Sequence, residues 1–225
     1  MSGIMREVLK EQKQGHAIGI YSACTGNELV LEACMRHAVA TGTPLLLEAT
    51  ANQVDQYGGY TGKNPAQYMK MIEELSEKTG LPMDRIVLGG DHLGPLTFAK
   101  YDEEKAMAEA SELVKQYVLA GFTKIHIDTS MKVASDDPDA RLSDQVIARR
   151  GAHLARVAEE AFACRKKENP QAVHPVYIVG SEVPVPGGSQ AVVDTGVKVT
   201  DPADFRSTVH TFEEAFAAEG LREEW

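Results

Sequence analysis

The chain alternates short apolar runs with longer amphipathic segments, and this alternation repeats five times. The apolar runs predict buried strands at residues 17–23, 44–50, 86–92, 124–130 and 175–182. The segments that follow them have helical spacing and predict helices at residues 27–40, 64–80, 103–120, 143–164 and 202–218. Repeated strand–helix units imply parallel strands joined by right-handed crossovers.

Helix start and stop signals agree with these bounds. Asn64 offers an N-cap with Pro65 at the first helical position, and Gly80 ends that helix. Asp201 and Pro202 open the last helix in the same manner.

Five such units suit either a doubly wound sheet or part of an eight-stranded barrel. The first strand–helix turn, residues 22–27, lacks the G-x-G-x-x-G that holds a pyrophosphate in the doubly wound dinucleotide-binding fold. We therefore expect an α/β fold of the (β/α)8 TIM-barrel type, with five βα units in a single domain over residues 1–225.

Three predicted strands end in ionisable residues, and α/β barrels place their chemistry at the carboxyl ends of strands. Asp91 and His92 end the third strand and suggest a catalytic carboxylate beside a metal-binding imidazole. Glu182 is the carboxylate that follows the fifth strand and is a second catalytic candidate. The alternative for Asp91 and His92 is a capping role toward loop N–H groups.

The fourth strand alternates apolar and polar residues. Ile125 and Ile127 are expected to face the helices, which leaves His126, Asp128 and Ser130 on the interior face. His126 lies deeper and is predicted to be a hydrogen-bonded core histidine rather than a ligand. Asp128 and Ser130, nearer the mouth, are candidate substrate contacts.

Further candidate substrate contacts lie in and after the second strand. Glu48 is alone among apolar residues and needs a partner, either structural or within the site, because an unpaired buried charge is costly. Gln53, Gly58 and Gly59 belong to a loop over residues 53–63 that either covers a ligand or is an ordinary surface loop. Its glycine and lysine spacing is not that of a P-loop, so a kinase gets no support.

Composition narrows the class of protein. A net charge of −10 argues against nucleic acid or an anionic membrane as a partner. No apolar run reaches the ~18 residues of a membrane span, and residues 1–14 lack a signal-peptide core. Cys24, Cys34 and Cys164 are odd in number and widely spaced, so we expect buried thiols in a reducing cytoplasm.

The charge run at residues 136–139 is predicted to be a solvated loop, and Arg149 and Arg150 are predicted to be surface residues.

Taken together, these motifs resemble the tagatose-1,6-bisphosphate aldolase Z-subunit family (GatZ/KbaZ). The matching segments are residues 19–24, 47–50, 52–54, 58–62, 89–95, 126–130 and 180–188. The family is similar to class II zinc-dependent sugar-bisphosphate aldolases, which carry an Asp-His pair after the third strand. The resemblance implies an acid/base role for Asp91, a zinc ligand at His92 and, more loosely, a catalytic loop carboxylate at Glu182.

The resemblance also implies a role. The Z subunit looks like a non-catalytic partner that supports the activity and stability of a catalytic Y subunit in galactitol or N-acetylgalactosamine catabolism. The alternative is an enzyme in its own right, a metal-dependent aldolase or 4-epimerase. It would act on tagatose-1,6-bisphosphate or a related ketose phosphate, with Asp91 moving the proton. A third alternative is a sugar-phosphate-binding module without chemistry.

The chain departs from the family in one respect that bears on these alternatives: family members are about twice as long as this chain. The aldolases take further metal ligands from later strands. His153 lies on a predicted helix and His174 precedes the fifth strand, which leaves His92 and Glu182 as plausible ligands. Five strands in barrel order also leave two open edges. We therefore expect either further polypeptide after Trp225 or a second chain, and hence an oligomer.

Overall fold

The computed structural model describes residues 3–181 and 201–225. Its strands are β1 (Ser22–Cys24), β2 (Leu45–Thr50), β3 (Ile86–Leu93), β4 (Lys124–Ile127) and β5 (Val176–Ile178). Its α-helices are α1 (Ile4–Lys13), α2 (Glu28–Thr41), α3 (Pro65–Thr79), α4 (Glu103–Ala120), α5 (Asp144–Glu168) and α6 (Pro202–Ala218). Short 3-10 turns lie at Gly59–Thr61, Met83–Arg85 and Pro95–Phe98.

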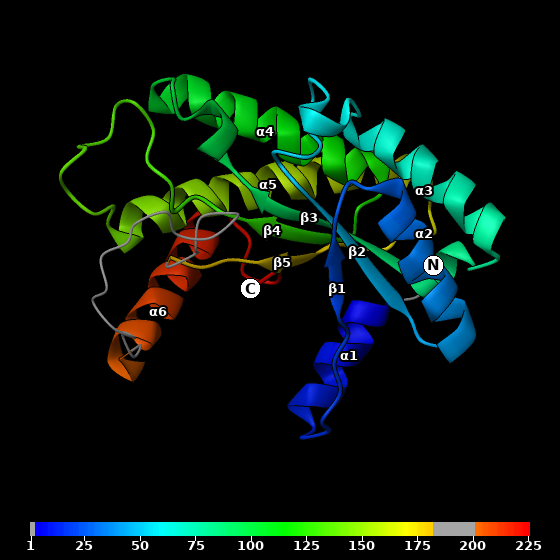
Figure 1. Ribbon diagram of the computed structural model, residues 1–225. Coiled ribbons are helices and arrows are strands. Elements are labelled where there is room, and N and C mark those ends of the chain that lie inside the picture. Colours follow the sequence, from blue (N-terminus) through cyan, green and yellow to red (C-terminus); the bar gives the residue numbers. More distant parts are fainter. Residues whose placement is uncertain (1–2, 182–200) are drawn as a thin grey trace, which may run out of the picture.

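The strands form one parallel sheet in the order β1-β2-β3-β4-β5 (Figure 1). A doubly wound sheet reverses its strand order at a switch point, whereas this order follows the chain throughout. Helices α2 to α6 likewise pack each against the next. The predicted α/β fold with parallel βα units is therefore confirmed, and the strand order is the one found in a barrel. Within the described residues, β1 and β5 are the edges of the sheet.

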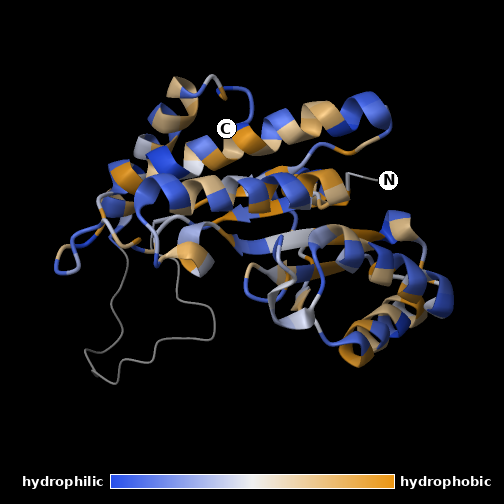
Figure 2. Ribbon diagram, turned by 90° about the horizontal axis from the view of Figure 1, so that it is seen from above, coloured by the Kyte–Doolittle hydropathy of each residue, from blue (hydrophilic) through white to orange (hydrophobic). Residues whose placement is uncertain are grey.

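The core lies between the sheet and the helices. Leu45, Leu47 and Ile125 are fully buried on the strands, and Tyr117 of α4 is fully buried against them. The Tyr117 hydroxyl donates to the Val54 carbonyl oxygen at 2.8 Å, so this buried polar group is satisfied. Figure 2 shows that the helices alternate hydrophobic and hydrophilic residues, as expected when one face packs on a sheet.

The helix bounds agree closely with the sequence, and the edge strands do not. Asn64 caps α3 in a capping box with Pro65 at its first turn. By contrast, β1 is confined to Ser22–Cys24 and β5 to Val176–Ile178, because an edge strand has a neighbour on one side only. Helix α1 was not expected; of its residues only Val8 is buried.

Two predictions about side-chain burial were wrong. Cys24 and Cys164 are exposed and Cys34 is half-buried. Arg150, predicted at the surface, is 1% exposed. It lies on the helix face of Ile147 and Leu154, which the helical repeat turns toward the core.

Arg150 is buried because two carboxylates meet it there. Its guanidinium donates to Asp136 at 2.7 and 2.9 Å and to Glu103 at 2.7 Å. Asp136, expected in a solvated loop, is therefore tied to α4 and α5. These ion pairs anchor the β4–α5 loop at the carboxyl end of the sheet.

In the part of the chain that the structure describes, no helix is long and apolar enough to cross a membrane.

Candidate functional site

Asp91 and His92 lie side by side at the carboxyl end of β3. Successive strand residues normally point to opposite faces of a sheet. Here the β3–β4 register shifts between Gly90 and Leu93, and His92 has φ 51°, the single positive φ among the described non-glycine residues. Such a bulge re-aims side chains, and backbone outliers of this kind gather at functional sites. The irregularity lets both side chains reach β4.

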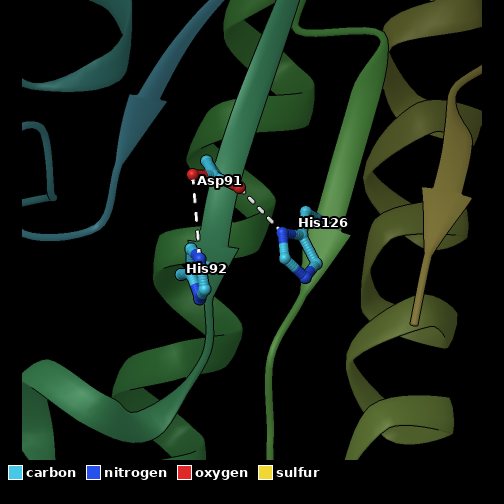
Figure 3. Close-up of side chains that lie close together, drawn as sticks. All are labelled: Asp91, His92 and His126. Atoms are coloured by element: carbon cyan, nitrogen blue, oxygen red, sulfur yellow. Dashed lines mark hydrogen bonds and ion pairs between the residues drawn. The ribbon is translucent and has the colours of Figure 1, made fainter. Parts of the chain in front are cut away.

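His126 of β4 completes a cluster with this pair (Figure 3). Its Nδ1 donates to Asp91 Oδ1 at 2.7 Å, and its ring centroid lies 4.7 Å from that of His92. Asp91, His92 and His126 each offer one ligand atom, and these atoms lie within 4.8 Å of one another. Sequence reasoning treated His126 only as a core histidine. The signal that includes it in the site was its place on the interior face of β4.

Asp128 lies behind this cluster and orients His92. Its side chain is 2% exposed and accepts three hydrogen bonds: from His92 Nδ1 at 2.9 Å, from Ser130 N at 3.0 Å and from Ser130 Oγ at 2.7 Å. The bond from Nδ1 leaves His92 Nε2 directed at Asp91, 3.9 Å away. A Cβ on Gly94 would lie 1.8 Å from the Asp128 carbonyl oxygen, so only glycine lets the chain after β3 pass here. Asp128 and Ser130 therefore support His92.

The partner that Glu48 requires comes from β4 and β1. Lys124 Nζ and Ser22 Oγ both donate to the Glu48 carboxylate, which is buried. Glu48 pairs in register with Gly89, two residues before Asp91, so the ion pair lies one layer below the cluster. A Cβ on Gly89 would stand 2.6 Å from Glu48 Oε1, so glycine at this position makes room for the carboxylate.

Gln53 lies at the rim of the cluster. Its Oε1 accepts from Thr50 N at 2.8 Å and stands 3.9 Å from Cys24 Sγ, which is itself 3.7 Å from Asp91 Oδ2. The glycine loop packs on the backbone of Gln53, since a Cβ on Gly59 would lie 2.5 Å from the Gln53 carbonyl oxygen. Gly59 thus reaches the site through Gln53, whereas Gly58 packs against Gly62 within the loop.

The electrostatics of the cluster separate Asp91 from Cys24. Burial favours a higher pKa for Asp91, but the hydrogen bond from His126 and the electrostatic interaction with His92 outweigh it, so the pKa lies below the usual value. Although Cys24 is exposed as a whole residue, its thiol points toward Gln53 and Asp91. Desolvation of the thiol there, followed by the charges of Asp91 and Glu48, raises the pKa of Cys24 to about 12. At neutral pH, Asp91 is a carboxylate and Cys24 a protonated thiol, so Cys24 is a poor nucleophile.

Glu182 lies outside the described residues, and its role as a second catalytic carboxylate stays a prediction. What the structure brings together is a carboxylate and two imidazoles at the carboxyl end of adjacent parallel strands. This is the place where barrel-type βα proteins carry their active sites. The fold and the cluster thus define an α/β protein of parallel βα units in chain order, with a candidate metal centre.

The comparisons with known proteins give the family. The model of the D-tagatose-1,6-bisphosphate aldolase subunit GatZ/KbaZ-like family matches residues 5–225. The chain belongs to this family. The crystal structure of a probable tagatose 6 phosphate kinase from Sinorhizobium meliloti 1021 superposes with a TM-score of 0.76 at 37% identity, over 92% of this chain and 46% of that one. The chain therefore spans about half the length of that relative.

A more distant likeness is to the YdjI aldolase from Escherichia coli K12. The TM-score is 0.46 at 14% identity, over 94% of this chain and 61% of that chain.

Proposed function

We propose that the chain is an accessory, non-catalytic subunit of a D-tagatose-1,6-bisphosphate aldolase that supports the activity and stability of a catalytic Y-type subunit. The observation that carries the proposal is the match to a family of aldolase subunits over residues 5–225. The subunit would serve galactitol or N-acetylgalactosamine catabolism. We place it in the cytoplasm, because the reducing conditions there keep cysteines such as its three free thiols unpaired.

The cluster at the carboxyl end fits a divalent metal ion such as zinc. Two imidazoles and a carboxylate form a donor set that zinc accepts, and catalytic zinc sites commonly have three protein ligands. The bond from His92 to Asp128 is the kind of outer-shell contact that orients metal-ligating histidines. When bound, the ion would polarise the oxygens of a ketose phosphate.

A second function is favoured by the same cluster. Asp91, His92 and His126 supply three ligand-capable groups where sequence reasoning counted His92 and Glu182. This supports the alternative in which the chain is a metal-dependent ketose-phosphate aldolase or 4-epimerase in its own right. In this alternative His92 and His126 would hold the ion, and Asp91, ionised and hydrogen-bonded by His126, would take the substrate proton as a general base instead of serving as a third ligand.

One experiment separates the two functions. The purified chain is assayed for tagatose-1,6-bisphosphate cleavage and for 4-epimerisation, with and without Zn²⁺, alone and with a Y-type subunit. The accessory proposal expects negligible turnover alone and a higher rate or longer lifetime of the partner. Metal-dependent turnover by the chain alone, lost in Asp91→Asn, would establish the alternative. The absence of both effects would overturn both proposals.

A further inference from the structure

A second cluster of histidine and carboxylate groups lies at the opposite, amino end of the sheet. Glu159 comes from the middle of α5, His174 from the segment just before β5, and Glu224 from the tail after α6. Each offers one ligand atom, and these atoms lie within 4.8 Å of one another. The residues belong to three separate elements, so the tertiary fold, rather than one helix face, brings them together.

His174 has a hydrogen-bond partner for each ring nitrogen. Its Nε2–H donates to Glu159, at 2.9 and 3.0 Å from the two carboxylate oxygens. Its Nδ1 lies 2.8 Å from the Pro175 carbonyl oxygen, an acceptor that an Nδ1–H could use if a cation replaced the proton on Nε2. Phe162 packs edge-on against the ring with centroids 4.7 Å apart, which fixes its plane. A cation that replaced the Nε2 proton would leave Nδ1–H to the Pro175 carbonyl, which is the arrangement common among zinc-bound histidines.

Glu159 is held in place as well. The Tyr177 hydroxyl of β5 donates to Glu159 Oε1 at 2.5 Å. The Glu159 side chain is 18% exposed and that of His174 is 31% exposed, so a small hydrated ion can reach the cluster without a change of fold. Two carboxylates and a neutral imidazole carry a charge of about −2, which a divalent cation neutralises.

We propose that Glu159, His174 and Glu224 form a divalent-cation site at the amino end of the sheet, separate from the Asp91–His92–His126 cluster. The mixed nitrogen and oxygen donor set suits Zn²⁺, with water in the fourth position. Because the three ligands come from α5, the approach to β5 and the tail, the bound ion fastens the last residues of the chain to the sheet.

Arg6 of α1 is the built-in competitor of such an ion. Its Nη2 lies 2.7 Å from His174 Nδ1 and 3.4 Å from the Pro175 carbonyl oxygen. A guanidinium only donates, so its bond to Nδ1 requires the proton to sit on Nε2, the atom that a metal needs free. Binding of the cation therefore displaces Arg6 from the ring, and the positive charge of Arg6 weakens the site.

The test counts zinc on the purified chain by equilibrium dialysis against micromolar ZnCl₂. His174→Ala and Glu224→Gln are each expected to lose one zinc equivalent relative to the unmodified chain. Glu224→Gln changes one atom near the chain end, which guards against misfolding as the cause. His210→Ala is the matched control, because His210 is an exposed histidine within 3.3 Å of Glu214 and 3.7 Å of Glu213 on a single helix. It should bind as much zinc as the unmodified chain.

Arg6→Ala distinguishes a cation site from a simple ion-pair cluster. Removal of the competing charge is expected to tighten zinc binding about tenfold, the effect of a unit charge about 6–7 Å from a divalent ion in water. An ion-pair cluster without metal affinity would give no such gain. The proposal is overturned if zinc binding is unchanged in His174→Ala and Glu224→Gln, or if Arg6→Ala leaves the affinity the same or weaker.

Discussion

The two ends of the sheet carry similar side chains on very different supports. At the carboxyl end, Asp91, His92 and His126 lie on adjacent strands, and a bulge and the buried Asp128 fix their directions. At the amino end, the groups come from a helix, a connecting segment and the chain tail (Glu159, His174 and Glu224). Sites on strands hold their geometry more tightly than sites on loops. We therefore expect the cluster at the carboxyl end to keep its geometry more tightly than the cluster at the amino end.

The largest expected effect concerns the anchor of the carboxyl end. Arg150→Met leaves Glu103 and Asp136 without their buried cation, which should lower the free energy of unfolding by about 3 kcal/mol. Urea denaturation followed by circular dichroism measures it. Arg149→Met is the matched control: Arg149 is an exposed neighbour that pairs with Glu103 alone, and its loss should cost under about 0.5 kcal/mol. Equal losses of unfolding free energy in the two variants would show that the buried ion pairs of Arg150 add no more stability than an exposed pair.

A smaller effect sharpens the contrast between the two clusters. Asp128→Asn keeps the shape of the side chain but weakens the acceptor for His92 Nδ1. Zinc affinity at the carboxyl end should fall about 10- to 100-fold, as for other outer-shell partners, while binding at the amino end is unaffected. Isothermal titration resolves the two. Asp139→Asn, a change at an exposed loop residue, is the control. Weakening of both sites together would mean that they are not independent.

Amide hydrogen exchange can test the contrast between the edges and the centre of the sheet. Amides of β1 and β5 have a strand neighbour on one side within the described residues, whereas β3 is paired on both sides. Exchange in β1 should exceed that in β3 by about tenfold or more. Tyr21, Leu29 and Val30 are exposed apolar side chains beside β1, as expected of an uncovered edge. Strong protection of both edge strands in a well-dispersed monomer would contradict the expectation that another chain or segment covers them.

The smallest effect is a loss of stability in acid. The hydrogen bonds from Arg150 lower the pKa of Asp136 below its ordinary value. A group with a lowered folded pKa stabilises fully above its unfolded pKa of about 4, and this contribution fades as the pH falls through the folded value. Unfolding transitions from pH 6 to pH 2.5 should therefore show a steeper loss in the unmodified chain than in Asp136→Asn. Parallel curves would mean that the pair adds no pH dependence.

Sequence patterns that depend on neighbouring residues predicted most of the fold. Caps such as Asn64 and the apolar alternation of β4 depend on residues near in sequence, and the helices and the parallel order followed from them. The Asp91 and His92 pair could be predicted as a site because the carboxyl ends of strands carry the active sites in such folds.

The rest depended on partners far apart in sequence. Lys124 meets Glu48 across β3, and Arg150 is buried because Glu103 and Asp136 converge on it. A charged residue looks like a surface residue until such partners are placed. His174 was set aside because it precedes β5, although the fold brings Glu159 against it.

The proposed metal centre would hold a divalent ion between Asp91, His92 and His126 at the carboxyl end of the sheet. The most direct test is an anomalous difference map at the zinc absorption edge, from crystals of the chain grown with ZnCl₂. We expect a peak within about 2.0–2.2 Å of a nitrogen of each histidine and of an Asp91 oxygen, and no such peak in His126→Gln. A map with no peak at this cluster, from crystals that show zinc elsewhere on the chain, would contradict it.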